Sequence, residues 1–394
     1  MHLARLALTD FRCYGDADVR FSPGVTIFTG PNGAGKTNLV EAAMYVATFA
    51  SHRVATDAPL IRAGAERAIL RAAVRSAGRD CLVEIELNAG RANRVRLNRA
   101  PLARPRDALG TLRCVLFAPE DLAIVKGDPE QRRRYLDDLL VASRPRYAAV
   151  RADYERVVKQ RTALLKSARA DRAGRPAGPG SSPPALEVWD DQLIAAGAEL
   201  TAGRLRLSRA LGPLITARYA DVAGDQRTAA ADYRLGGKAP ASAGGTGPAS
   251  GPEDGELDHD LAALAEYLRA NLERLRRAEL ERGVCLVGPH RDELELRIGD
   301  LPARGYASHG ESWSLALALR LAAFDLLRAD GDGPVLLLDD VFAELDTGRR
   351  DRLAELAAGA EQVIVTAAVT ADVPSLLTNG GASFTVQDGV ISRA

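Results

Sequence analysis

Residues 30–37 have the composition and spacing of a loop that holds phosphate groups. They read Gly-Pro-Asn-Gly-Ala-Gly-Lys-Thr, a complete Walker A pattern, between an apolar stretch at 25–28 and a helical pattern at 39–46. Glycines let backbone N–H groups wrap an anion, and a helix start adds a favourable dipole. Lys36 is expected to reach the β- and γ-phosphates in a catalytic role, and the Thr37 hydroxyl to bind Mg²⁺. We therefore predict that ATP binds to Gly30, Pro31, Asn32, Gly33, Ala34, Gly35, Lys36 and Thr37.

Two adjacent carboxylates follow a second apolar segment, far along the chain. The continuous run at 335–338 is typical of a buried parallel strand, and Asp339 and Asp340 come directly after it. This is a Walker B pattern. Asp339 is predicted to hold Mg²⁺ through water, and Asp340 to serve as the catalytic base or to orient the attacking water.

A Ser-x-Gly sequence, Ser308 to Gly310, opens the helix that leads to this strand. A hydroxyl and free N–H groups at a helix start can bind phosphate. Ahead of a Walker B strand, the pattern resembles the signature of ABC ATPases, which in that family faces the nucleotide of the partner subunit. Ser308 and Gly310 are therefore predicted to bind nucleotide, and residues 344–346 resemble the D-loop of the same family.

The elements around these motifs alternate between strands and helices, which predicts an α/β fold. The strand-rich segments are 1–118 and 284–394, and they contain all of these motifs. We predict that together they form one ABC-type P-loop ATPase head. Helical patterns dominate 119–283, which is predicted to be an inserted, mainly helical second domain with low-complexity linkers near 170–184 and 236–256.

Composition excludes several other classes. Lys plus Arg and Asp plus Glu both number 52, so the net charge gives no argument for nucleic acid, and any such argument must be local. The four cysteines are scattered, which argues against zinc or disulfide chemistry. No apolar run reaches the length of a membrane span, and the first residues lack a secretory pattern. We therefore expect a cytoplasmic protein with no membrane contact.

Several further stretches resemble the RecF family among the ABC and SMC-like ATPases. The similarity covers most of the chain outside the two low-complexity stretches, and it is carried by Phe11-Arg12-x-Tyr14, by residues 117–122 with 125–127 and 132–134, by Gly288-Pro289-His290-Arg291-Asp292, and by residues 338–346.

This resemblance implies an ATP-dependent homodimer that binds DNA at single-strand gaps. It also implies a slow, DNA-stimulated ATPase that works with RecO and RecR to load RecA on gapped DNA. Roles in replication and in the SOS response follow from the same resemblance.

Some residues within the resemblance have open roles. Arg12 is expected to contact a nucleotide phosphate, or else to be an exposed arginine at a strand end. Glu120 or Asp121 is expected where ABC proteins have the Q-loop glutamine, unless these residues only cap a helix. His290 and Arg291 could line the site, follow the DNA or form a structural turn.

The chain also departs from the family pattern at two places. Glu311 stands where signatures commonly have Gln, and a carboxylate there would weaken closure onto a partner's phosphate unless it points away. No switch histidine follows the strand at 362–365, which agrees with slow hydrolysis.

Two regions are candidates for DNA contact. Residues 126–175 contain fourteen Lys or Arg and seven Asp or Glu, a local net charge of +7, which predicts a helical surface that follows DNA phosphates unless it is only a solvated helical face. The alternative is a patch on the head made of Arg94, Arg96, Arg99, Arg104, Arg106 and Arg113.

Other classes of ABC-type protein would need features that this sequence lacks. A transporter ATPase subunit would need a switch histidine. An SMC-like or RecN-like arm would need long heptad runs, whereas the helical stretches of about 30 residues are interrupted by Pro and Gly. An ABC-head nuclease would need a second carboxylate cluster.

Overall fold

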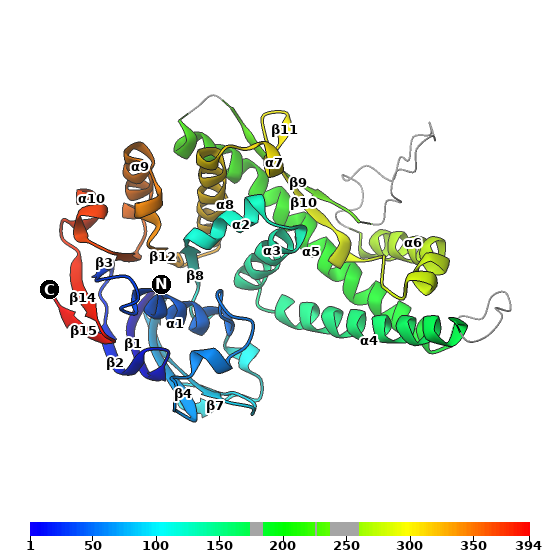
Figure 1. The fold of residues 1–394 in the computed structure, drawn as a ribbon, viewed down its shortest axis with the longest axis horizontal. Coiled ribbons are helices and arrows are strands. Elements are labelled where there is room, and N and C mark those ends of the chain that lie inside the picture. The colour runs from blue at the N-terminus through cyan, green and yellow to red at the C-terminus, as the bar shows by residue number, and fades with distance from the viewer. Residues whose placement is uncertain (174–183, 225–226, 237–259) are drawn as a thin grey trace.

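A parallel sheet made from both ends of the chain forms the centre of the head (Figure 1). The computed structural model describes residues 1–173, 184–224, 227–236 and 260–394. The strand order is β15-β14-β3-β13-β12-β8, and only β15 runs antiparallel to its neighbour. The strands are β3 (Gly24–Thr29), β8 (Cys114–Phe117), β12 (Val335–Asp339), β13 (Gln362–Ala367), β14 (Ala382–Gln387) and β15 (Val390–Arg393).

Both faces of this sheet are covered, as its apolar strands require. Every residue of β12 is buried. Leu336 and Leu338 face a core shared with helices α8 (His309–Ala329) and α9 (Thr347–Ala358), whereas Val335 and Leu337 face a second core that includes α1 (Lys36–Thr48). The prediction of a buried parallel strand at 335–338 is confirmed.

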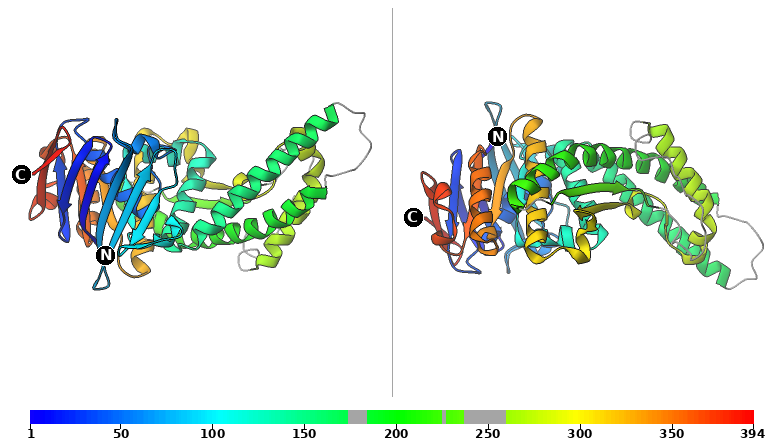
Figure 2. Two further views of the ribbon diagram at one scale, coloured as in Figure 1. Left: turned by 90° about the horizontal axis from the view of Figure 1, so that it is seen from below. Right: turned by 90° about the horizontal axis from the view of Figure 1, so that it is seen from above.

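A second, antiparallel sheet closes the core on the α1 side (Figure 2). Its order is β2-β1-β4-β5-β6-β7. Alternating residues of its long strands are buried, and charged residues occupy the other face. The strands are β1 (His2–Phe11), β2 (Tyr14–Arg20), β4 (Arg67–Ser76), β5 (Arg79–Asn88), β6 (Arg94–Leu97) and β7 (Ala100–Pro101).

An elongated arm of helices projects from the head (Figures 1 and 2). Its longest helix packs against α8, so one apolar core continues from the head into the arm. The arm helices are α2 (Leu122–Lys126), α3 (Pro129–Ser143), α4 (Tyr147–Ala173), α5 (Pro184–Ala223) and α6 (Leu261–Arg282). No helix in the described ranges is long and apolar enough to cross a lipid bilayer.

Helix α5 corrects one expectation. It runs for 40 residues with Pro213 inside it, although Pro and Gly were expected to break the helical stretches. Gly203 is a place of close packing: a Cβ there would lie 2.7 Å from the Tyr147 ring and 2.9 Å from Leu140. The Thr216 hydroxyl donates to Gly212 O at 3.2 Å, beside the proline. Tertiary packing therefore overrides local propensity here.

A small sheet joins the predicted insertion to the returning chain. Strand β9 (Ala229–Arg234), which was not predicted, pairs along its whole length with β10 (Glu293–Ile298), and β11 (Leu301–Pro302) completes the order β11-β10-β9. The proposed boundary at 283/284 therefore runs between two paired strands, and the division into 1–118 plus 284–394 and 119–283 stays a prediction. Most of the two predicted linkers lies outside the described residues.

Candidate nucleotide-binding site

The phosphate loop connects β3 to α1, and its backbone requires glycine. Gly30 has φ +155°, and a Cβ there would lie 2.1 Å from the carbonyl oxygen of Val386. Gly35 has φ +117°, and a Cβ there would lie 2.6 Å from Cys13 Sγ. The Tyr14 hydroxyl donates to Gly35 O at 2.9 Å. The turn before β2 and the C-terminal strand β14 therefore support the loop from behind.

The amino group of Lys36 lies inside this loop. The side chain is only 3% exposed, and Nζ donates to Gly30 O at 2.9 Å and to Pro31 O at 3.3 Å. The nearest carboxylate recorded for it, Asp340, is 4.0 Å away. No side chain caps the described start of α1, and its first turn holds no acidic residue. A buried cation and a free helix start are the features that bind phosphate.

Parallel strand pairing brings a carboxylate to the same point. Asp339 ends β12 beside Thr366 of β13. The Asp339 Oδ1 atom accepts hydrogen bonds from the hydroxyls of Thr37 at 3.1 Å and Thr366 at 2.5 Å. Burial, together with the charges of Asp340 and Glu120, raises the pKa of Asp339 to about 6 despite these bonds. The fold thus holds a carboxylate whose negative charge is poorly compensated.

Such a carboxylate fits a divalent cation. Thr37 and Asp339 offer a hydroxyl and a carboxylate within hydrogen-bond distance of each other, and both are oxygen ligands of the kind that Mg²⁺ prefers. Groups of three or more His, Cys, Asp or Glu suited to a metal are absent from the described residues. Phosphate oxygens and water would complete the coordination, as is usual for Mg²⁺.

Asp340 is held by its backbone with its side chain partly open. It has φ +50°, and its N–H donates to Thr366 Oγ1 at 3.0 Å. Burial raises its pKa, while the charge of Lys36 opposes that rise. Its carboxylate is 33% exposed, so it can meet water. The Thr366 hydroxyl donates to Asp339 and accepts from Asp340 N, so it orients both acids. The sequence analysis missed Thr366, which follows the strand predicted at 362–365, where no switch histidine was found.

The two residues considered for the Q-loop position separate in the structure. Asp121 is buried and paired with Arg320 at 2.6 Å. Glu120 is exposed and close enough to Asp339 to raise its pKa. Of the two, Glu120 is therefore the one that lies near Asp339 with an exposed side chain.

Arg12 is held by a buried carboxylate on the Walker A helix. Its Nε and NH2 atoms donate to the two oxygens of Glu41 at 2.9 and 2.8 Å. Glu41 also accepts from the Ser51 hydroxyl at 2.5 Å, and Arg53 lies 3.8 Å from it. Arg12 therefore has a partner within the chain, and its contact with a phosphate stays a prediction. The sequence analysis missed Glu41, Ser51 and Arg53; a glutamate among the apolar residues of α1 was the available signal.

The predicted signature lies on a different part of the head. Ser308 caps α8, its Oγ accepting from Glu311 N at 3.3 Å and its N–H donating to Glu311 Oε2 at 2.7 Å. Glu311 also forms an ion pair with Arg227, so its carboxylate is turned into its own chain. Ser308 is exposed, and α7 (Ala303–Tyr306), which leads into it, lies away from α1 in Figure 1.

His290 and Arg291 lie in the arm. The His290 ring bonds Tyr154 Oη at 2.6 Å through Nδ1 and Cys285 O at 3.2 Å through Nε2. Arg291 donates to the same carbonyl at 2.6 and 3.0 Å. Both side chains therefore secure the turn before β10, and the structure does not bring them to the phosphate loop.

Comparisons with known proteins agree with this architecture. The family model described as the RecF/RecN/SMC N terminal domain matches residues 2–386. The chain is 56% identical over 393 residues to the DNA replication and repair protein RecF of Streptomyces avermitilis. It is also 56% identical over 394 residues to the protein of that name from Frankia alni. The alignments cover 100% of this chain and of both relatives.

Solved structures extend the agreement to three dimensions. The recombination mediator protein RecF-ATPrS in the RecFOR pathway matches with a TM-score of 0.85 and 25% identity, covering 100% of this chain and 98% of that one. An Smc head bound to the C-winged helix domain of ScpA matches with a TM-score of 0.55 and 17% identity, which shows the fold alone. The expected α/β ABC-type head is confirmed, and the chain belongs to the RecF family.

Proposed function

We propose that this protein is an ATP-hydrolysing, DNA-binding protein of recombinational gap repair. The observation that carries the proposal is the meeting of Lys36, Thr37, Asp339 and Asp340 at the ends of β3 and β12, in a chain that belongs to the RecF family. Relatives solved as RecF-ATP and RecF-ATPrS support ATP as the nucleotide. Our assignments of these residues to nucleotide binding and catalysis are part of the proposal.

In the proposed mechanism the chain binds the phosphates before it acts on them. The loop N–H groups and Lys36 neutralise the β- and γ-phosphates, while Thr37 and Asp339 hold Mg²⁺, which when bound spreads the charge of the γ-phosphate. Asp340 orients the attacking water and accepts its proton. The raised pKa of Asp340 makes it a better proton acceptor than an ordinary aspartate.

Hydrolysis is proposed to be slow. A switch histidine would contact the γ-phosphate beside Asp340, and Thr366, the residue before the end of β13, lies beside Asp340 instead. A hydroxyl that already donates to Asp339 and accepts from Asp340 N cannot take or give a proton as readily as an imidazole. ATP can then persist long enough to act as a signal.

ATP is proposed to join two copies of the chain. Ser308 and His309 are exposed at the start of α8, and Tyr306 beside them is 68% exposed. In a two-fold dimer this surface would cover the nucleotide on the partner, and the same contact would repeat at the second site. Glu311 does not obstruct that contact, because its carboxylate is held by Ser308 N and Arg227.

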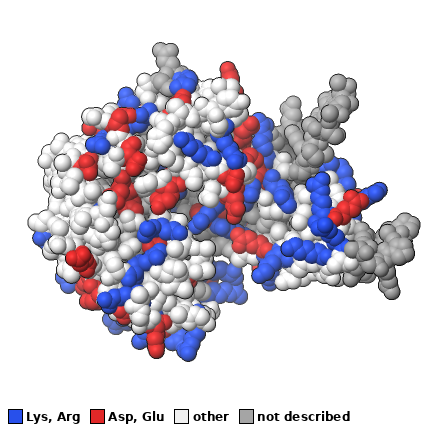
Figure 3. All heavy atoms as spheres, in the orientation of Figure 1, with Lys and Arg blue, Asp and Glu red and all other residues white. Residues whose placement is uncertain are grey.

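For DNA, we propose contact through the arm in preference to the head patch, and the support is the distribution of charge on the surface. In the head patch Arg94 pairs with Glu86 and Arg113 donates to the carbonyl of Asp332, whereas Arg96, Arg99 and Arg104 are exposed with no acidic partner recorded in the described part of the chain. On α4, Lys159 and Lys166 are exposed without a recorded acidic partner among the described residues. On the face in Figure 3, acidic and basic side chains mix over the head, and basic ones predominate on the arm. We propose that α4 contacts DNA phosphates.

The cellular part of the proposal follows from family membership. The named relatives are DNA replication and repair proteins, and the solved ones belong to the RecFOR pathway. We propose that this protein works in the cytoplasm with RecO and RecR to load RecA at gaps, which supports replication and the SOS response.

The test is ATP hydrolysis with no DNA, duplex DNA, single-stranded DNA and gapped duplex DNA. We expect a low rate that rises most with gapped duplex. Lys36→Ala should lower ATP affinity by about 10- to 100-fold, because a charge-assisted contact to phosphate is lost. A rate that no DNA changes would refute DNA stimulation, and full ATP affinity in Lys36→Ala would refute the assigned site.

Dimerisation is tested by sedimentation with ATP, ADP and a slowly hydrolysed analogue. ATP that binds at an interface shared by two copies must shift the equilibrium toward the dimer. ADP lacks the γ-phosphate and should not cause this shift. Ser308→Arg should keep ATP binding to the monomer and abolish ATP-dependent dimerisation, since a bulky side chain fills the seam. Normal dimerisation of that variant would remove the role proposed for Ser308 and Gly310.

A further inference from the structure

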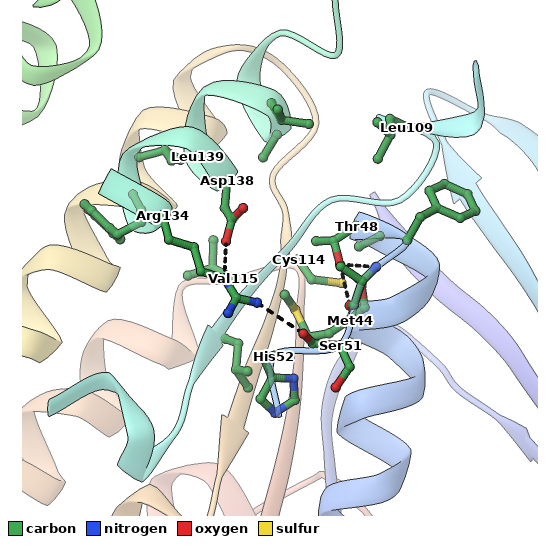
Figure 4. Close-up of a pocket in the computed structure, with 18 of the residues that line it drawn as sticks. Met44, Thr48, Ser51, His52, Leu109, Cys114, Val115, Arg134, Asp138 and Leu139 are labelled. Carbon is green, nitrogen blue, oxygen red and sulfur yellow. Dashed lines mark hydrogen bonds and ion pairs between the residues drawn. The ribbon is translucent and has the colours of Figure 1, made fainter. Parts of the chain in front are cut away.

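A large cavity lies between the Walker A helix and the arm (Figure 4). Its volume is about 870 Å³. One wall is the end of α1 and the loop after it, including Thr48 and His52, and the other is formed by β8 and α3, including Cys114 and Leu139. Glu120, which is close to Asp339, also lines it. The cavity thus reaches from the arm to Glu120, on the side of the proposed magnesium site.

Arg134 of α3 reaches across this cavity. Its NH2 atom donates to the backbone oxygen of Ser51 at 3.1 Å. Asp138, one turn further along α3, lies 3.6 Å from the same guanidinium and holds it in place. Figure 4 shows the Arg134 side chain between Asp138 on its own helix and Ser51 on the opposite wall.

Ser51 is tied in turn to the Walker A helix. Its hydroxyl donates to the buried Glu41 at 2.5 Å and accepts from Arg53 N at 3.0 Å and Val54 N at 3.1 Å. These bonds fix the turn at 51–54. The Arg53 side chain then lies against Asn38 Oδ1 at 3.3 Å, and Asn38 directly follows Thr37. The Arg53 guanidinium thus lies near the phosphate loop, and a shift of Ser51 would move it.

Helix α3 is fixed to the body of the arm. Arg132 donates to both oxygens of Glu293 at 2.8 and 2.9 Å, and Arg133 donates to Asp292 O at 2.8 Å. The Tyr135 hydroxyl also donates to Leu319 O of α8 at 2.7 Å, so a change in the position of the arm and α8 together would carry α3, and with it Arg134, as a unit. A contact between packed elements of this kind can transmit a displacement that binding at one end produces.

We infer that Arg134 is a positioning residue which links the arm to the nucleotide site through Ser51 and Arg53. DNA held on the arm would set the position of α3, and Arg134 would set the turn at 51–54. The Arg53 guanidinium would then stand beside the phosphates in the DNA-bound state. This inference rests on the proposed DNA-stimulated ATPase and assigns one residue to its stimulation.

The experiment measures the ratio of the ATPase rate at saturating gapped duplex DNA to the rate without DNA. The parent is compared with Arg134→Gln and with Arg144→Gln. Arg144 is exposed at the end of the same helix, and no side-chain partner is recorded for it in the described part. We expect the ratio to fall by about 2- to 30-fold in Arg134→Gln and to be unchanged in Arg144→Gln.

DNA affinity, measured by anisotropy of a labelled gapped duplex, separates this role from direct DNA contact. Arg134→Gln should bind DNA as the parent does, and Arg134→Lys, which keeps the charge but not the length, should also lose stimulation. A parent-like ratio in Arg134→Gln overturns the inference while DNA stimulation of the parent stands. Weaker DNA binding with a full ratio at saturation would make Arg134 a DNA contact and also overturn it. An unstimulated parent would instead refute the proposed function itself.

Discussion

The nucleotide site and the arm each contain a buried group of charges, and the two groups are arranged in opposite ways. In the arm, Arg161 is fully buried and bonds Asp190 at 2.7 Å and both oxygens of Glu279 at 2.9 and 2.6 Å. These contacts join α4, α5 and α6. Arg161 and its carboxylates satisfy one another, and burial of this kind needs such pairing.

At the nucleotide site the charges are close but incompletely paired. Lys36 is 4.0 Å from Asp340 and donates to carbonyl oxygens instead. Burial raises the pKa values of both Asp339 and Asp340, and the charge of Asp340 adds to the rise at Asp339. The comparison shows that a structural cluster completes its own bonds, whereas a binding site leaves charge for a ligand to complete.

The largest expected effect separates the two aspartates of the site. Asp340→Asn should lower ATP turnover by about 10²- to 10⁴-fold, because an amide cannot accept the proton of the attacking water. Mg²⁺–ATP binding should remain, since Thr37 and Asp339 are intact. Single-turnover hydrolysis and a nucleotide-binding titration measure the two quantities, with exposed Asp351→Asn as the control. Parent turnover in Asp340→Asn would assign the water to another residue.

Substitutions in the arm cluster should change the free energy of unfolding and not the rate of ATP hydrolysis. Glu279→Gln leaves Arg161 without its bidentate carboxylate and should lower the free energy of unfolding by about 3–5 kcal/mol. Glu281→Gln on the same helix removes an exposed pair with Arg277, which solvent screens, and should leave the free energy of unfolding nearly unchanged. Denaturant unfolding of the two variants provides the comparison. Equal losses would mean that the buried cluster is no more important to the fold than a surface pair.

His290 gives a pH-dependent test within the arm. Burial is the main cause that lowers its pKa to about 4, and the neutral ring accepts from Tyr154 Oη and donates to Cys285 O. The pKa of His290 is about 6.5 in the unfolded chain and about 4 in the folded one. Its contribution to the free energy of unfolding is therefore complete above pH 6.5 and is lost as the pH falls toward 4.

The matched variant is His290→Gln, which does not titrate. At pH 7.5 it should be less stable than the parent, because it loses a hydrogen bond. Between pH 6.5 and 4 the gap between the two free energies of unfolding should narrow by about 3 kcal/mol. A gap that stays constant over this range would mean that the folded histidine titrates normally.

The sequence was informative where chemistry is local. The stretch from Gly30 to Thr37 and the acids after the run at 335–338 could be recognised from consecutive residues alone. Thr366 and Glu41 could not, because their importance comes from strand pairing and from a turn ten residues away. The same reason hid β9: its Ala-rich sequence at 229–234 has little strand character, and β10, some sixty residues later, supplies its partner. Which residues bind nucleotide and DNA stays a prediction.

The smallest effect is expected for the free energy of unfolding of the nucleotide-free protein, where the arm cluster and the nucleotide site can be compared directly. Glu279→Gln and Asp340→Asn make the same change, a carboxylate to an amide, in the two clusters. Glu279 stabilises the fold, whereas Asp340 is ionised at a cost, since burial raises its pKa. Asp340 is one-third exposed, so solvent screens most of that cost.

Asp340→Asn should therefore raise the free energy of unfolding by about 0.5–2 kcal/mol, the usual range for a single stabilising substitution. The gain should shrink when Mg²⁺–ATP is added, because the bound cation relieves the carboxylate pair of the parent. Denaturant unfolding without nucleotide measures the gain in the free energy of unfolding, and the same experiment with Mg²⁺–ATP measures how far that gain shrinks. If Asp340→Asn instead destabilises the nucleotide-free protein as Glu279→Gln does, the charges of the nucleotide site are as completely paired within the fold as those of the arm cluster. The distinction between the two regions would then be wrong.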